Sequence, residues 1–290
     1  MALVAAVAAF SAACAENQKP AARPAGTPVQ LQTATKQQLV EAYNAQAKAI
    51  HSINATISIK LTAGTQYSGV IKQYHQVNGF ILAQEPSSVR VIGQAPIVGT
   101  NIFDMVSDGE TFHIFIPSKN KFLEGPATLQ KESAKPIENL RPQHLTEALF
   151  WSPIAEGAPV LFEAGDESNA RYYVLTVVQS AGVAASSSGE WLVARGVWFD
   201  RADLSIARLQ VYDTSGNVIS DVRYSQWDTF GSVRFARDIQ VTRPEDDYSL
   251  EIEVKKMTAN EPVSPDRFVL KQPPGSELVK VGEDSKESQP

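Results

Sequence analysis

Most of the chain alternates between apolar and polar side chains with a period of two. In the clearest run, Leu250, Ile252 and Val254 alternate with two glutamates and a lysine. Successive side chains of a strand point to opposite faces, so this run predicts a strand with one buried and one solvated face. Turn-forming residues separate such runs, as is typical of antiparallel strands. The strands predicted in this way are residues 53–62, 66–76, 79–84, 88–93, 101–107, 111–117, 121–125, 158–165, 171–179, 190–200, 206–213, 218–227, 233–242 and 249–257.

Two segments carry helical spacing instead. A helix is predicted for residues 35–50, because Thr35 and Gln38 can form a capping box and the apolar residues that follow recur every three or four positions. A shorter helix is predicted for residues 141–151, which begin with Arg-Pro and place Leu145 on an apolar side.

The predicted strands must form a curved sheet. The sequences "DTSGN" and "SDGE" lie between strands and support hairpins. About a dozen strands in one sheet have to curl or close to protect their edges. The fold class predicted is therefore mostly β with helices (α+β), built on a strongly curved antiparallel sheet.

The N-terminus resembles that of a bacterial lipoprotein. Residues 2–13 are apolar apart from Ser11, a length that suits a secretion signal, whereas a membrane-spanning helix needs roughly 20 residues. Small residues precede Cys14 as in a lipobox, although Ser11 stands where leucine is usual and no basic residue precedes the apolar run. We expect residues 1–13 to be a signal peptide and Cys14 to be lipidated. The alternative is an apolar first helix or strand with a buried cysteine.

Composition divides the rest of the chain. Residues 14–34 are rich in proline, alanine and polar side chains and are expected to form the lipidated N-terminus and a flexible tether. Residues 35–281 form one domain, and residues 282–290 are expected to be a disordered tail. The net charge of −6, with scattered basic residues, argues against a nucleic-acid partner.

The sequence shows no motif for catalysis. It lacks a Gly-x-Ser-x-Gly elbow, a His-Glu-x-x-His motif, a phosphate loop and Cys/His metal spacing. The four histidines are dispersed, and the acidic clusters at residues 200–203 and 245–247 stand where aspartate is favoured in turns. We expect no enzyme, no metal and no cofactor. A hydrolase whose site is assembled from distant strands is an alternative.

Large apolar side chains are unusually abundant for a sheet with one solvated face. A curved sheet with few helices to cover it could leave an apolar cavity that suits acyl chains. The alternative is a filled core. The residues chosen as candidates for the cavity wall are Phe80, Leu82, Phe103, Met105, Phe112, Ile114, Phe150 and Trp198.

Several motifs together resemble the LolA/LolB superfamily of bacterial lipoprotein carriers and receptors. They are "VSDGETFHIFIPSKNKFLEG", "WFDRADLSIARLQVYDTSGNVISDVRYSQW", "VRFARDIQVT" and "RFVLKQPPGSELV", in the order and spacing of the carriers. The resemblance covers most of residues 35–281. It implies an incomplete antiparallel barrel over two or three helices, enclosing a lipid-binding cavity.

One loop extends the resemblance to the membrane-anchored receptor. There, a Pro-Leu-Gly loop projects an apolar side chain toward the membrane. The sequence "QAPIVGT" places Ile97 and Val98 in the corresponding hairpin position. The resemblance implies that these two residues form a membrane-insertion loop, and the alternative is that they pack inward.

The resulting expectation is a lipoprotein anchored by acyl groups such as palmitate on Cys14, in the outer membrane and facing the periplasm. It would bind acyl chains of lipids or lipoproteins in its apolar cavity and aid their transfer or insertion, and a periplasmic carrier is one candidate donor. Ala15 after the cysteine resembles outer-membrane lipoproteins. The alternative function is a non-transporting structural or interaction module of an envelope assembly.

Overall fold

The computed structural model describes residues 30–64, 71–127, 141–167, 170–180 and 191–281. The predicted signal peptide (1–13), the lipidation site Cys14, most of the tether and the tail (282–290) lie outside these residues. Those predictions therefore stay predictions.

The first helix, α1, spans Lys36–Lys48. The predicted capping box is present, because Thr35 Oγ1 accepts from the Gln38 backbone N–H at 3.3 Å and Gln38 Oε1 accepts from the Thr35 N–H at 2.9 Å. Leu39 and Tyr43 of its apolar side are fully buried. The helix prediction is confirmed.

The second helix, α3, spans Gln143–Leu149 and confirms the second prediction. Short 3₁₀ helices, η1 (Pro117–Lys119) and η2 (Pro265–Phe268), complete the helical elements of the described residues. In that part of the chain, no helix combines the length and the apolar character needed to cross a bilayer.

The strands of the described residues join in one sheet. They are β1 (Ser52–Ala63), β2 (Lys72–Gln73), β3 (Val77–Gln84), β4 (Ser88–Gln94), β5 (Asn101–Ser107), β6 (Thr111–Ile116), β7 (Lys121–Pro126), β8 (Val160–Glu167), β9 (Ala170–Ser180), β10 (Trp191–Asp200), β11 (Ile206–Tyr212), β12 (Val218–Phe230), β13 (Val233–Arg243), β14 (Tyr248–Ala259) and β15 (Glu277–Lys280).

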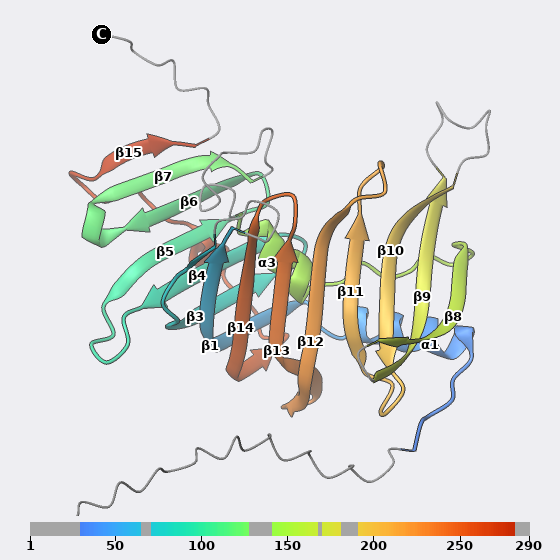
Figure 1. Ribbon diagram of the computed structural model, residues 1–290. Coiled ribbons are helices and arrows are strands. Elements are labelled where there is room, and N and C mark those ends of the chain that lie inside the picture. The colour runs from blue at the N-terminus through green and yellow to red at the C-terminus, as the bar shows by residue number, and fades with distance from the viewer. Residues whose placement is uncertain (1–29, 65–70, 128–140, 168–169, 181–190, 282–290) are drawn as a thin grey trace, which may run out of the picture.

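Their order is β15-β7-β6-β5-β4-β3-β1-β14-β13-β12-β11-β10-β9-β8, with β2 beside β1. The sheet is large, curved and open, with β15 and β8 at its two edges (Figure 1). The mostly β fold with one strongly curved sheet is therefore confirmed.

Cross-strand register divides the sheet into two faces. The partners Ile59, Ile252, Ile239 and Tyr224 form a row across β1, β14, β13 and β12, and all belong to the buried cluster that contains Leu39 of α1. Directly opposed residues share a face. We call the face of the sheet that contains this row the helix-facing side, and we call the opposite face the open face.

Strand β15 was not predicted. It runs parallel to β7, with Leu278 opposite Phe122, and the Glu277 N–H donates to the Asn120 carbonyl at 2.9 Å. A strand this short, preceded by Pro-Pro-Gly, carries little local pattern. The predicted strand 66–76 is described only from residue 71, where β2 is two residues long.

Candidate functional site

Aromatic side chains fill the helix-facing side. The rings of Tyr43 and Trp151 stack with their centroids 5.9 Å apart, and Tyr224 meets Trp151 edge-on at 5.1 Å. Trp227 lies 6.3 Å from Trp151. A cavity lined by Gln46 and other residues of this region holds only about 10 Å³, about the lower limit for a single water molecule. This part of the interior is a packed core.

Five of the eight cavity candidates belong to the helix-facing side. Met105 is opposite Ile114 in the sheet, and Phe112 is opposite Ser107. The Ser107 hydroxyl accepts a hydrogen bond from the side chain of Gln143 in α3. Met105 and Phe112 are fully buried, and Phe103, Ile114 and Phe150 pack against the main cluster. The structure brings these five together as core residues.

The other three candidates lie on the open face. Phe80 is opposite Ile92 and Leu82 is opposite Arg90, so both alternate with the buried Ile81. Trp198 lies next to Arg208, whose guanidinium carbon is 5.0 Å from the Trp198 ring centroid. The eight residues therefore do not share one cavity wall.

Two adjoining grooves follow the open face of β1, β3 and β4. One, of about 320 Å³, is lined by Phe80, Leu82, Arg90, Ile92, Asn54 and Arg267. The other, of about 290 Å³, shares Asn54, Leu82 and Arg267 with the first and continues along the segment after β14. Phe80 is 44% exposed, although it is a large apolar side chain. The first groove thus combines an apolar floor with cationic walls.

The hairpin loop between β4 and β5 exposes its two apolar residues. Ile97 is fully exposed, at 104% of its reference area, and Val98 is 70% exposed. The Gly99 N–H donates to the Ala95 carbonyl at 3.1 Å and closes the loop. Ile97 has φ of 78°, a left-handed conformation that is costly for a β-branched residue. The loop holds these side chains outward rather than packing them on the sheet.

A larger groove, of about 540 Å³, lies farther along the open face and is polar. Lys60 pairs with Glu251 at 3.3 Å on one side. Asp238 and Glu253 stand directly opposite each other on β13 and β14. Most of its lining side chains are polar, whereas three of the six that line the groove beside Phe80 are apolar.

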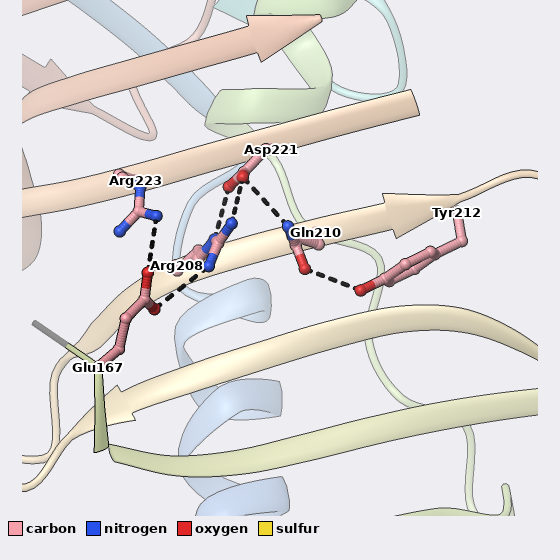
Figure 2. A network of polar contacts seen from close by, with 6 residues as sticks. All are labelled: Glu167, Arg208, Gln210, Tyr212, Asp221 and Arg223. Atoms are coloured by element: carbon pink, nitrogen blue, oxygen red, sulfur yellow. Dashed lines mark hydrogen bonds and ion pairs between the residues drawn. The ribbon is translucent and has the colours of Figure 1, made fainter. Parts of the chain in front are cut away.

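A network of charged side chains covers the open face of β11 and β12 (Figure 2). Arg208 donates from Nε to Asp221 Oδ1 at 2.8 Å and from Nη2 to Oδ2, and its Nη1 donates to Glu167 at 3.3 Å. Gln210 joins Asp221 to the Tyr212 hydroxyl. The hydrogen bond to Asp221 is the largest cause that raises the pKa of Arg208. Because these groups satisfy one another's hydrogen bonds, the network links strands β8, β11 and β12.

An ionic cluster joins α3 to the β13–β14 hairpin, and its Glu147 side chain is 52% exposed. Arg243 donates to Asp246 at 2.7 Å and to Glu147 at 3.2 Å. The His144 ring hydrogen-bonds the Tyr248 hydroxyl. Both His144 and Tyr248 are buried. The contacts of the cluster fasten α3 to the sheet.

In the described part of the chain, no group of three His, Cys, Asp or Glu side chains could hold a metal ion.

No family model and no curated protein matches the sequence. Among solved structures, the chain is similar to a LolA superfamily protein from Nitrosomonas europaea, with 12% identity and a TM-score of 0.48 over 82% of this chain and 99% of that one. It is also similar to a DUF1329 family protein from Desulfovibrio piger, with 10% identity and a TM-score of 0.49 over 79% and 94% of the two chains. A third similar structure is a putative outer membrane lipoprotein-sorting protein domain from Vibrio parahaemolyticus, with 9% identity and a TM-score of 0.44 over 79% and 94%. These are similarities of chain path at low sequence identity.

Proposed function

We propose that this protein is a lipoprotein of the bacterial cell envelope that binds acyl chains of lipids or lipoproteins and aids their transfer or insertion at a membrane. It acts by binding, without covalent chemistry. Its anchor is a lipidated Cys14 in the outer membrane, facing the periplasm, and a periplasmic carrier is a candidate donor. The curved sheet with its two helices acts as an incomplete barrel.

The observation that carries the proposal is the exposure of Ile97 and Val98 at the tip of the β4–β5 hairpin. Apolar side chains held outward at a loop tip can enter the boundary between lipid headgroups and acyl chains. Burying both would contribute roughly 3 to 5 kcal/mol at most. The loop is continuous with β4, whose residue Ile92 lines the apolar groove.

The acyl chain is assigned to the groove beside Phe80. The helix-facing side is filled around Trp151, whereas the groove on β3 and β4 has about 320 Å³ of open space and an exposed phenylalanine. An apolar floor with a few polar groups at its rim suits a lipid.

The test uses the full chain with Cys14→Ser, which cannot be acylated at that site. The protein is purified from a bacterial envelope without detergent, and its native mass spectrum is followed by organic extraction. Co-purifying acyl-containing species are expected, and Phe80→Ser should reduce them strongly. Leu161→Ser removes another exposed apolar side chain, at the β8 edge, and should leave them unchanged. A clean apo mass for the parent, with no uptake of added fatty acid or lipopeptide, would contradict the proposal.

The filled core favours a second candidate, a structural or interaction module of an envelope assembly. Tyr43, Trp151 and Tyr224 occupy the space where a lipid carrier would need a cavity. This candidate predicts that Ile97 and Val98 contact a protein partner, and that no lipid co-purifies.

A further inference from the structure

Arg267 lies over the open face at the point where the two grooves meet. It belongs to η2, and the Arg267 carbonyl accepts a hydrogen bond from Arg90 Nη1 at 3.0 Å. Arg90 is itself fixed by Asp104, through Nε at 3.0 Å and Nη2 at 2.6 Å. Both grooves count Arg267 among their lining residues. The backbone that carries this guanidinium is therefore anchored to β4.

The charge of Arg267 is available to a ligand. Within the described residues, its side chain makes no hydrogen bond or ion pair, whereas the charge of Arg90 is compensated by Asp104. Lys256 is likewise without a partner there, and it lies in the cross-strand row that runs through Thr56 to Phe80. Adjacent strands are about 4.8 Å apart, so Lys256 stands about 10 Å from Phe80 across the sheet.

The residues that line the first groove include no acidic side chain, whereas Glu261 lines the second groove and Asp266 precedes Arg267 in η2. Asp104 pairs with Arg90 and balances its charge. Arg267 therefore contributes one uncompensated positive charge to the lining of the first groove. The polar groove farther along the same face has the opposite character, with the opposed carboxylates Asp238 and Glu253.

The apolar part of the groove runs from Arg267 toward the hairpin loop. The opposed pair Leu82–Arg90 lies nearest to η2, the pair Phe80–Ile92 follows, and β4 then ends two residues later, at Gln94. A ligand with a negative head and an apolar chain would match this order. Its head would meet Arg267, and its chain would follow Phe80 and Ile92 toward the loop.

We infer that this groove binds an anionic phospholipid, with the headgroup phosphate held by Arg267 and Asn54. A guanidinium donates a pair of hydrogen bonds to phosphate oxygens, and an amide N–H₂ adds another donor. The uncompensated charge of Arg267 disfavours the choline of a zwitterionic headgroup. This inference rests on the proposed function, because it names the class of lipid that the proposed groove selects.

The test titrates the full chain carrying Cys14→Ser with short-chain lipids below their micelle concentration, so that no bilayer is present for the N-terminus to bind. Dioctanoyl phosphatidylglycerol is compared with dioctanoyl phosphatidylcholine by calorimetry. We expect phosphatidylglycerol to bind about tenfold more tightly, as is reasonable for one charge-assisted contact. Phosphatidylcholine carries the same phosphate, so Arg267→Gln should weaken the binding of both lipids, and should weaken phosphatidylglycerol more, so that the preference disappears.

Control variants separate the possible outcomes. Lys60→Gln removes a cation of the polar groove on the same face and should have no effect, and Arg267→Lys should retain part of the preference. Phe80→Ser should weaken both lipids equally. Equal binding of the two lipids by the parent, or an Arg267→Gln variant that keeps the preference for phosphatidylglycerol, would overturn the headgroup inference and leave the proposed function standing. If neither lipid binds the parent, both the inference and the proposed function are overturned. Octanoate and inorganic phosphate serve as further ligands, and a preference for either over phosphatidylglycerol would also contradict the inference.

Discussion

Trp151 donates a hydrogen bond from its indole nitrogen to the Tyr224 hydroxyl at 2.9 Å, and Tyr224 donates in turn to the Ala148 carbonyl at 2.8 Å. The chain thus connects the end of α3 to β12 through the middle of the core. Because burial raises the pKa of Tyr224, this hydroxyl stays protonated and can keep donating.

The variant Tyr224→Phe should destabilise the protein by about 1 to 3 kcal/mol. The substitution keeps the ring but leaves the buried Trp151 N–H and Ala148 carbonyl with only their longer hydrogen bond to each other, at 3.4 Å. Urea unfolding followed by tryptophan fluorescence measures the change. Tyr212→Phe is the control, because Tyr212 is partly exposed and donates only to Gln210 at 2.8 Å. Equal effects of the two variants would contradict the explanation.

Gly79 is required by the close approach of β3 and β4. A Cβ built on Gly79 would collide with the backbone carbonyl oxygen of Ile92. Gly79→Ala should therefore cost about 1 to 3 kcal/mol, since backbone must move. Gly165→Ala is the matched control, because a Cβ there meets open space. We expect the control to be neutral or slightly stabilising in thermal unfolding, and equal losses in both variants would be inconsistent with this reading.

The stability of the protein should fall as the pH decreases below about 6.5. Burial, and then the Arg243 and Arg141 guanidinium groups, hold the pKa of His144 well below its usual value of 6.5. The unfolded chain takes up a proton near pH 6.5, whereas the folded protein does not. The unfolded state then binds more protons, so stability is lost as pH falls from about 6.5 toward the folded pKa.

Comparison with His144→Gln isolates this contribution. Tyr248 and Asp246 contact the His144 ring, and Glu147 pairs with the nearby Arg243. Burial raises the pKa of Glu147, which acts in the opposite sense by losing stability as pH rises through its folded pKa. Both proteins retain these groups, so the difference between their urea midpoints from pH 7.5 to 5 reports on His144. His113→Gln on β6 is the control. A parallel pH dependence in parent and His144→Gln would refute the prediction.

The double variant Ile97→Glu with Val98→Glu should reduce lipid transfer between vesicles at least about tenfold. Two carboxylates at the tip would have to be desolvated to enter the headgroup boundary. Because both positions are exposed, the free energy of unfolding should change by less than about 0.5 kcal/mol. Transfer of a fluorescent acyl lipid from donor to acceptor vesicles provides the measurement.

Thr214→Glu with Ser215→Glu is the matched control for that variant. These residues are exposed in the β11–β12 turn, so they add the same charge to a hairpin tip on another part of the sheet. Unchanged transfer by the Ile97 and Val98 variant, or an equal loss in the control, would remove the β4–β5 loop from the mechanism.

Local pattern was enough to predict much of the fold. The start of α1 depends on Thr35 and Gln38, which lie three residues apart, and the alternation around Ile252 was sufficient to place β14. The turns at Asp108 and Asp213 were also predictable, because in each the aspartate side chain accepts hydrogen bonds from backbone N–H groups within four residues. In each case the interaction that forms the element lies within a few residues.

The candidate site was only partly predictable. The sequence placed Ile97 and Val98 at a hairpin but left their exposure open, and it grouped Phe80 with Met105 although the two lie on opposite faces. Arg267 was not singled out, because it stands in a segment with little strand or helix pattern. The unpaired cation and the apolar groove form a recognisable combination only when η2 is placed against β4.

The sequence by itself determined most of the segments that become strands and helices and which side chains alternate on each strand, because those properties depend on neighbours along the chain. Only the tertiary structure decided which face α1 and α3 cover, that β15 pairs with β7, and that Arg267 and Phe80 line the same groove. These relationships join segments that are far apart in the sequence, and they depend on pairing across the whole sheet and on burial of a common core.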